Sequence, residues 1–212
     1  MKLLTVVVVM VVASASGEGT AAPAEWAVDP PPGWLEEVIP QALRDRVQAA
    51  PGIAQAELRV WKPGDGGAAR LQAQWFVLRR GEDSEQKLID QFDLGLVRSI
   101  AKKDKQTDQP PRSVGSMLIR DTTIDKPHMR VRAVRRYQPA ADGVHVLFLG
   151  CSGEAIPATC DAAINGGRLS VENPTTLPAG GSQHSVAYDA GYVAGIVALL
   201  GLGAWLVFRK RG

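Results

Sequence analysis

The two cysteines of the chain, Cys151 and Cys160, have the clearest potential for chemistry. A redox-active pair usually has the spacing Cys-x-x-Cys at the start of a helix, whereas eight residues lie between these two. Two thiols are also too few for a four-cysteine zinc site. In an oxidising compartment a pair of this kind forms a structural disulfide. We therefore predict a Cys151–Cys160 disulfide, no metal and no cofactor.

Other potentially reactive residues do not form a recognisable enzyme motif. The run from Gly150 to Glu154 begins like the nucleophile elbow Gly-x-Ser-x-Gly, but Glu154 stands where the second glycine is required, so Ser152 is not predicted to be catalytic. The three histidines also lack a metal-binding spacing. We expect no enzyme activity, and a tethered periplasmic or extracellular hydrolase without a recognisable motif is the alternative.

A group of arginines is the main charged cluster. On a surface, they could dock an acidic partner or anionic lipid headgroups, or they could simply form a solvated sheet face that protects a strand edge. Net charge is only +2, which argues against a nucleic-acid partner. The residues assigned to this possible docking surface are Arg120, Arg130, Arg132, Arg135 and Arg136.

The N-terminal residues 1–16 have the features of a signal peptide. Lys2 provides a positive start, residues 3–12 are apolar except for Thr5, and small residues follow at 13–15. Cleavage could occur as late as residue 24. These features predict export of the rest of the chain.

The C-terminal residues 189–208 have the length and apolar character of a transmembrane helix. Three basic residues follow, so residues 209–212 are predicted to stay in the cytoplasm and the body to lie in the periplasm or outside the cell. Gly191 and Gly195 form a GxxxG pattern, which could support a homodimer through the membrane span. The predicted location is the inner cell membrane, with a single pass.

Between these ends we expect an extended lead-in at 17–33, a folded domain at 34–165 and a flexible tether at 166–188. Apolar periodicity predicts the fold class α+β, with a single mostly antiparallel sheet, packed helices and one C-terminal transmembrane helix. The expected helices are 34–50, broken or started at Pro40, 84–103 and 158–164. The expected strands are 55–62, 69–79, 116–123, 128–137 and 143–150, and the last, the most apolar, should be central.

This order of elements resembles the PsbP/Mog1-like α/β/α sandwich domains. The resemblance covers 34–165 and includes a last apolar strand that runs into Cys151 and a terminal helix that carries Cys160. It implies a domain that binds or helps assemble other proteins, generally without enzymatic activity. We therefore expect a membrane-anchored accessory subunit of a bacterial envelope or membrane complex, whose partners are the bilayer and other membrane or envelope proteins.

Overall fold

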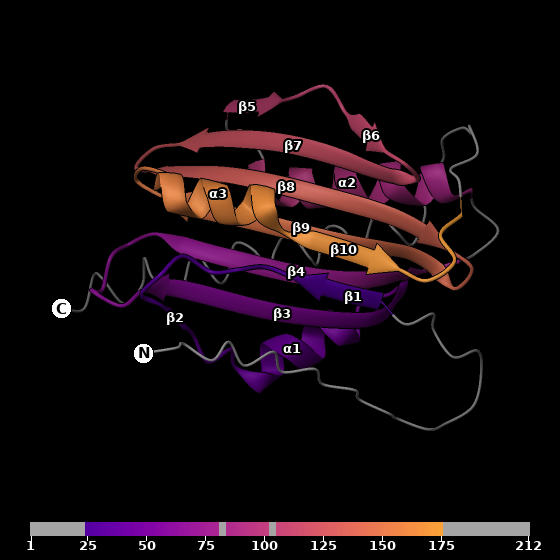
Figure 1. The fold of residues 1–212 in the computed structure, drawn as a ribbon, viewed down its shortest axis with the longest axis horizontal. Coiled ribbons are helices and arrows are strands. Elements are labelled where there is room, and N and C mark those ends of the chain that lie inside the picture. The colour runs from indigo at the N-terminus through magenta and orange to yellow at the C-terminus, as the bar shows by residue number, and fades with distance from the viewer. Residues whose placement is uncertain (1–23, 81–83, 102–104, 176–212) are drawn as a thin grey trace, which may run out of the picture.

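The computed structural model describes residues 24–80, 84–101 and 105–175, and its centre is one antiparallel sheet (Figure 1). Seven strands follow the order β2-β3-β4-β9-β8-β7-β5, and β6 pairs with β7 beside β5. The strands are β2 (Trp34–Glu36), β3 (Ile53–Pro63), β4 (Arg70–Arg79), β5 (Lys105–Asp108), β6 (Arg112–Val114), β7 (Met117–Lys126), β8 (Met129–Ala140) and β9 (Gly143–Gly153).

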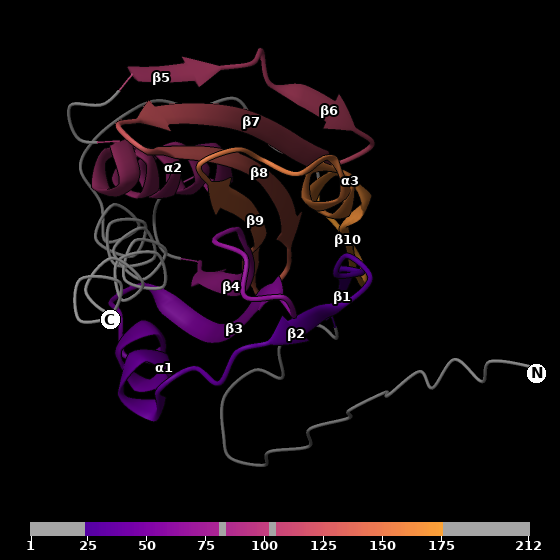
Figure 2. The same cartoon turned by 90° about the vertical axis from the view of Figure 1, so that its left-hand side faces the viewer.

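Both faces of the sheet are covered, as Figure 2 shows. Helices α1 (Gln41–Gln48) and α2 (Glu85–Ala101) pack on one face, which we call the α2 face. Helix α3 (Ala158–Gly166) and a ribbon made of β1 (Ala24–Ala27) and β10 (Arg168–Val171) pack on the other, the α3 face. Two apolar cores therefore lie on opposite sides of one sheet.

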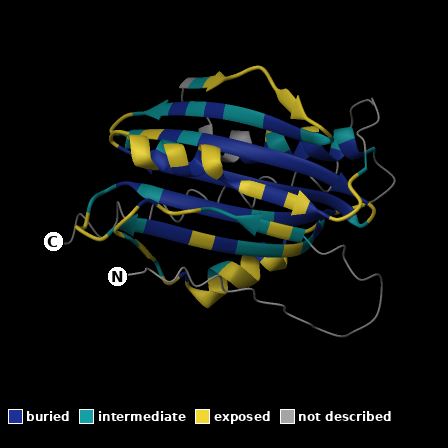
Figure 3. Cartoon of the chain, viewed as in Figure 1, coloured by how far each residue is buried: buried dark blue, intermediate teal, exposed yellow. Residues whose placement is uncertain are grey.

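Strand β9 shows why the sheet needs two covering layers. Its residues are buried along the whole strand (Figure 3), because alternate side chains enter opposite cores. Val146 and Phe148 belong to the core under α2, and Leu147 and Leu149 to the core under α3. A strand buried on both faces is almost continuously apolar. The prediction that this strand is central is confirmed by the strand order.

Helix α2 covers its face with an apolar stripe of helical spacing. Ile89, Phe92 and Leu96 are fully buried. The Phe92 ring lies 5.7 Å from that of Phe76 on β4 and 6.5 Å from that of Tyr137 on β8. The helix thereby joins strands that are far apart in the sequence.

The expected fold class, an α+β domain with a transmembrane helix, is wrong. The described residues form ten strands and three helices and are mostly antiparallel β-structure. None of these three helices is long and apolar enough to cross a membrane. The predicted signal peptide at 1–16, the span at 189–208 with Gly191 and Gly195, and the stub at 209–212 lie outside the described residues.

The expected helix at 34–50 is much shorter in the structure. Trp34–Glu36 instead forms β2 at the sheet edge, and α1 begins only after Pro40. Pro40 has an extended backbone, with φ −55° and ψ 135°. Proline lacks the N–H group that a helix interior needs and disfavours helical geometry in the residue before it. This position therefore separates strand from helix.

The β1–β10 ribbon contains residues that were expected in the lead-in and the tether. Ala24 pairs with Val171, and Trp26 pairs with Leu169. Leu169 and Val171 are buried in the core under α3. Each strand has four residues, so their long-range pairing leaves little pattern in the local sequence.

The last described residues lie at one end of the sheet. Pro174 forms a β-bridge with Ala140, and the Thr175 N–H donates to the Pro139 carbonyl. From this end β9 runs from Gly143 to Gly153, ten steps of about 3.4 Å or about 34 Å. Pro174 and Thr175 therefore lie far from the C-terminal end of β9.

Gly143, which follows the tight β8–β9 turn, should not tolerate a side chain. Its φ is 150°, and an added Cβ would lie 2.1 Å from the Leu78 carbonyl oxygen. We expect Gly143→Ala to lower the free energy of unfolding by about 1–3 kcal/mol, measured by urea denaturation. Gly166→Ala is the matched control, because its Cβ would meet nothing within 4 Å. Equal effects of the two substitutions would contradict this reading of the turn.

Candidate functional site

The predicted disulfide is confirmed. Cys151 on β9 is bonded to Cys160 on α3, with a Cα–Cα distance of 6.2 Å. Both residues are fully buried in the core under α3. The bond therefore fixes α3 to the central strand of the sheet.

The five arginines of the predicted docking surface lie on two opposite faces. Side chains alternate along β8, so Arg130, Arg132 and Arg136 lie on the α3 face and Arg135 lies on the α2 face. Arg120 on β7 is directly opposite Arg135 in the register. The five residues therefore cannot form one continuous surface.

Arg136 has an internal role at the end of α3. It is 6% exposed, and its guanidinium donates to the carbonyl oxygens of Ile164, at 3.3 Å, and Asn165, at 2.7 Å. Burial lowers the pKa of Arg136, partly offset by the charge of Asp121. The last carbonyl groups of a helix lack partners within the helix, and a cation there also complements the helix dipole. Arg136 is therefore a C-terminal cap for α3.

Arg130 and Arg132 are the more accessible arginines of this face. Arg130 is paired with Asp125 at 2.8 Å, and its side chain is 58% exposed. Arg132 is paired with Asp161 at 3.1 Å and lies 3.6 Å from Asp121. Docking of an acidic partner to these residues stays a prediction. Arg132→Glu would place three carboxylates together, so it would also lower stability.

Removing the Arg136 cap should destabilise the protein, whereas removing a surface charge on the same face should not. We expect Arg136→Ala to lower the free energy of unfolding by about 1.5–3 kcal/mol, because the hydrogen bonds from a buried charged group to two carbonyl groups of α3 are lost. The control Arg130→Ala removes an exposed pair and should cost less than about 1 kcal/mol. Urea denaturation of both variants measures the difference, and an Arg136→Ala variant as stable as the control would refute the capping role.

On the other face, a carboxylate joins α2 to the sheet. Asp93 accepts from the Tyr137 hydroxyl at 2.7 Å and lies 3.1 Å from Nε of Arg135 and 3.0 Å from Nη1 of Arg120. Arg120 also pairs with Asp90 one turn earlier on α2. The Arg135 side chain is only 2% exposed. The Asp93 carboxylate therefore balances the positive charges of Arg120 and Arg135, which lie between the sheet and α2.

The pKa shifts of Tyr137 and Arg120 keep both groups in the protonated forms that pair with Asp93. Burial and the charge of Asp93 raise the pKa of Tyr137 well above its ordinary range, so its hydroxyl remains a donor at neutral pH. Burial alone would lower the pKa of Arg120, but the charge of Asp93 and the hydrogen bond to Asp90 raise it overall. We interpret this network as the connection between α2 and the sheet. Its carboxylates, Asp90 and Asp93, pair with groups of the sheet strands rather than facing an open site.

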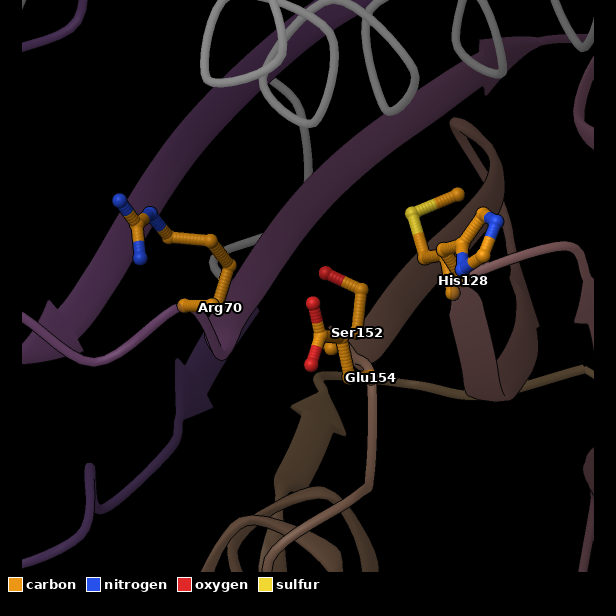
Figure 4. Close-up of a pocket in the computed structure, with 7 residues that line it drawn as sticks. Arg70, His128, Ser152 and Glu154 are labelled. Atoms are coloured by element: carbon orange, nitrogen blue, oxygen red, sulfur yellow. The ribbon is translucent and has the colours of Figure 1, made fainter. Parts of the chain in front are cut away.

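A small pocket lies at the end of the sheet where β4 begins and β9 ends. In Figure 4, Ser152 and Glu154 lie between Arg70 on one side and His128 on the other. Among the described residues, no group of three or more His, Cys, Asp and Glu could hold a metal ion. The pocket, which we call the sheet-end pocket, is lined by Ala68, Arg70, His128, Met129, Ser152, Gly153 and Glu154.

His128 reaches this pocket from an unusual backbone conformation. It has φ 63° in the two-residue turn that joins β7 to β8, after Pro127. Few residues other than glycine adopt this left-handed region, although histidine is among the more tolerant. Sequence analysis placed His128 at the start of a strand, because the two-residue turn contains no glycine that would have indicated a turn at this position.

Ser152 and Arg70 are held as parts of the sheet. Ser152 lies within β9, paired with Arg70 on one side and Val131 on the other, rather than in the sharp strand-to-helix turn of a nucleophile elbow. The Arg70 guanidinium pairs with Glu37 at 3.0 Å and donates to the carbonyl of Gly67. Arg70 thus forms a fixed wall of the pocket.

Two glutamines continue inward from the pocket along β4. Gln72 and Gln74 follow Arg70 at two-residue steps, so all three side chains leave the sheet on the α2 face. Gln72 is 6% exposed and Gln74 is fully buried. Nε2 of both residues and Oε1 of Gln74 have no hydrogen-bond partner among the described residues.

Sequence analysis missed these glutamines. The alternating run at 69–79 suggested one buried and one solvated face, and Gln72 and Gln74 fell on the face taken as solvated. The structure covers both faces of β4, so its polar positions are buried. The available signal was the presence of Phe76 and Leu78 on the same face as Gln72 and Gln74, since a strand that is apolar on both faces is usually covered on both.

Comparisons with known proteins do not identify a family. No family model matches the chain, so its resemblance to PsbP/Mog1-like domains stays a prediction. No curated protein matches it either. Among solved structures, the chain is similar to the extracellular domain of PknH from Mycobacterium tuberculosis, with 12% identity over 69% of this chain and 80% of that chain. The TM-score is 0.32, too low to support any inference about this protein.

Proposed function

We propose that this protein is an exported binding domain, tethered to a membrane, that helps hold or assemble a larger envelope complex. The Cys151–Cys160 disulfide is the observation that carries the proposal. Disulfides persist in oxidising compartments and are rare in the cytosol. This agrees with the signal-peptide features at residues 1–16 and the apolar segment at 189–208 in the sequence.

The position of the last described residue supports a tethered arrangement. Thr175 lies beside the β8–β9 turn. The sheet-end pocket lies at the other end of β9, about 34 Å away. A tether that begins at Thr175 would leave the pocket free to meet a partner away from the membrane.

Reporter fusions in living cells test the location. An alkaline phosphatase fusion after Thr175 should be active, because this enzyme requires an oxidising compartment, and the same fusion after Gly212 should be inactive. An inactive fusion after Thr175 would refute export. Activity of both fusions would refute the membrane tether.

Native co-purification tests the binding role. The full chain, extracted from membranes in mild detergent, should bring the same envelope proteins with it in repeated preparations identified by mass spectrometry. An unrelated single-pass protein with the same tag is the control for detergent carry-over. Recovery of this chain alone would contradict an assembly role.

A further inference from the structure

The C-terminal end of α3 carries a chemically labile pair of residues, Asn165 followed by Gly166. Asparagine is labile because the backbone nitrogen of the next residue can attack its side-chain amide, and glycine has no side chain to hinder that attack. The only other asparagine of the sequence, Asn173, precedes Pro174, whose nitrogen carries no hydrogen. Asn165 is therefore the only asparagine of the chain that can react in this way.

The reaction is a deamidation, and water is its only co-reactant. The backbone nitrogen of Gly166 forms a bond to Cγ of Asn165, and the side-chain NH2 group leaves with the proton of that nitrogen as ammonia. Water then opens the resulting cyclic imide at either of its two carbonyl groups, which gives aspartate or isoaspartate. Asn165 and Gly166 are both exposed on the outer side of α3 (Figure 3), so water reaches them.

The folded helix opposes this attack. In an α-helix each backbone N–H donates to the carbonyl group four residues earlier, so the Gly166 nitrogen is not available while the last turn is closed. The Asn165 side chain is also held in place. Its Nδ2 donates to Asp161 at 3.2 Å, and its Oδ1 accepts from Nη2 of Arg132 at 3.5 Å.

Arg136 holds the peptide group that would react. Its Nη2 donates at 2.7 Å to the carbonyl oxygen of Asn165, which belongs to the same peptide group as the Gly166 nitrogen. A second donor of the guanidinium reaches the Ile164 carbonyl at 3.3 Å. A cation at this oxygen also makes the N–H group more acidic, but acidity has no effect while the closed turn keeps the nitrogen from reaching Cγ. Opening of the last turn is therefore the step that limits the reaction.

We propose that Asn165 is a deamidation site, and that the Arg136 cap sets its rate in the folded protein. The rate follows the fraction of molecules in which the last turn of α3 is open, which is a local unfolding equilibrium. The product has a carboxylate where the Asn165 amide donated to Asp161, so a hydrogen bond is replaced by repulsion between like charges. Deamidation thus weakens the end of α3 and adds negative charge beside Arg132.

The variant Arg136→Ala tests the role of the cap. The purified full chain in detergent is incubated at mildly alkaline pH, and deamidation is followed by intact mass and located by peptide mapping. Arg136→Ala should react at Asn165 at least about tenfold faster than the wild type, because the two hydrogen bonds that hold the last turn are lost. Arg136→Lys keeps a cation without the forked pair of donors, so its rate should increase less, and it replaces Arg136→Ala if that variant does not fold.

Two matched variants separate the cap from other effects. Arg130→Ala removes an exposed arginine of the same face and should leave the rate unchanged. Gly143→Ala controls for a general loss of stability, because its strain lies at the β8–β9 turn, and it should raise the rate less than Arg136→Ala.

Gly166→Ala tests the reacting pair itself. Its added Cβ would meet nothing within 4 Å, so the fold is kept while the methyl group hinders attack. The variant should react more slowly than the wild type, both folded and unfolded in urea, and the unfolded wild type should react fastest of all.

Two kinds of result would overturn the proposal. A rate for Arg136→Ala equal to or below that of the wild type would show that the cap does not control the reaction. If Asn165 stays intact in the folded wild type and in the folded cap variants while the unfolded chain reacts, or if the mass change maps to glutamine residues, the site is wrong. The exported binding role does not depend on either outcome.

Discussion

Replacement of Asp93 by asparagine is expected to lower the free energy of unfolding by about 3–5 kcal/mol. Asp93 contacts Arg120, Arg135 and Tyr137, and the Arg135 side chain is almost completely buried. The substitution keeps the size of the side chain but leaves a buried guanidinium without its counter-charge. Urea denaturation at neutral pH measures the loss.

Asp90→Asn is the matched control, because it removes another carboxylate of α2 that pairs with Arg120. The Asp90 side chain is 48% exposed, so this change should cost less than about 1 kcal/mol. The double variant Asp93→Leu/Arg135→Met removes both charges and should be more stable than Asp93→Asn. Equal losses for Asp93→Asn and Asp90→Asn would contradict a buried charge balance at Asp93.

The second large effect concerns the disulfide. Replacing Cys151 and Cys160 by alanine should lower the free energy of unfolding by about 2.5–3 kcal/mol, because the unfolded chain is no longer closed into a short loop. Both sulfur atoms are also buried between β9 and α3, so the variant should lose packing there. Urea denaturation with and without dithiothreitol provides the measurement.

Reduction supplies the control within the same experiment. Dithiothreitol should destabilise the wild type by a similar amount and leave the double-alanine variant unchanged. A wild type whose stability does not respond to complete reduction would show that the bond does not support the fold. The same data also test whether α3 depends on its covalent connection to the central strand.

Strongly periodic segments of the fold could be predicted from the sequence, and short paired segments could not. The apolar runs at 143–150 and 84–103 correspond to β9 and α2, because burial of many residues enforces a regular pattern. Strands β1 and β10 have four residues each and pair across most of the chain length. No local pattern encodes such a pairing, which depends on the completed α3 face.

The candidate sites were also only partly predictable from the sequence. The disulfide could be predicted because the chain has only two cysteines. The arginines were grouped by proximity in the sequence, but Arg135 and Arg136 are consecutive and therefore enter opposite cores. Their carboxylate and carbonyl partners come from α2 and α3, whose positions only the three-dimensional fold defines.

The redox state of Cys151 and Cys160 in intact cells tests the central claim most directly. Cells are treated with a thiol-blocking reagent before lysis, and the protein is then reduced and labelled with a maleimide of high mass. An exported domain with the observed bond should gain two labels only after reduction. Blocking of both thiols before reduction would show a reduced pair and contradict the placement of this domain in an oxidising compartment.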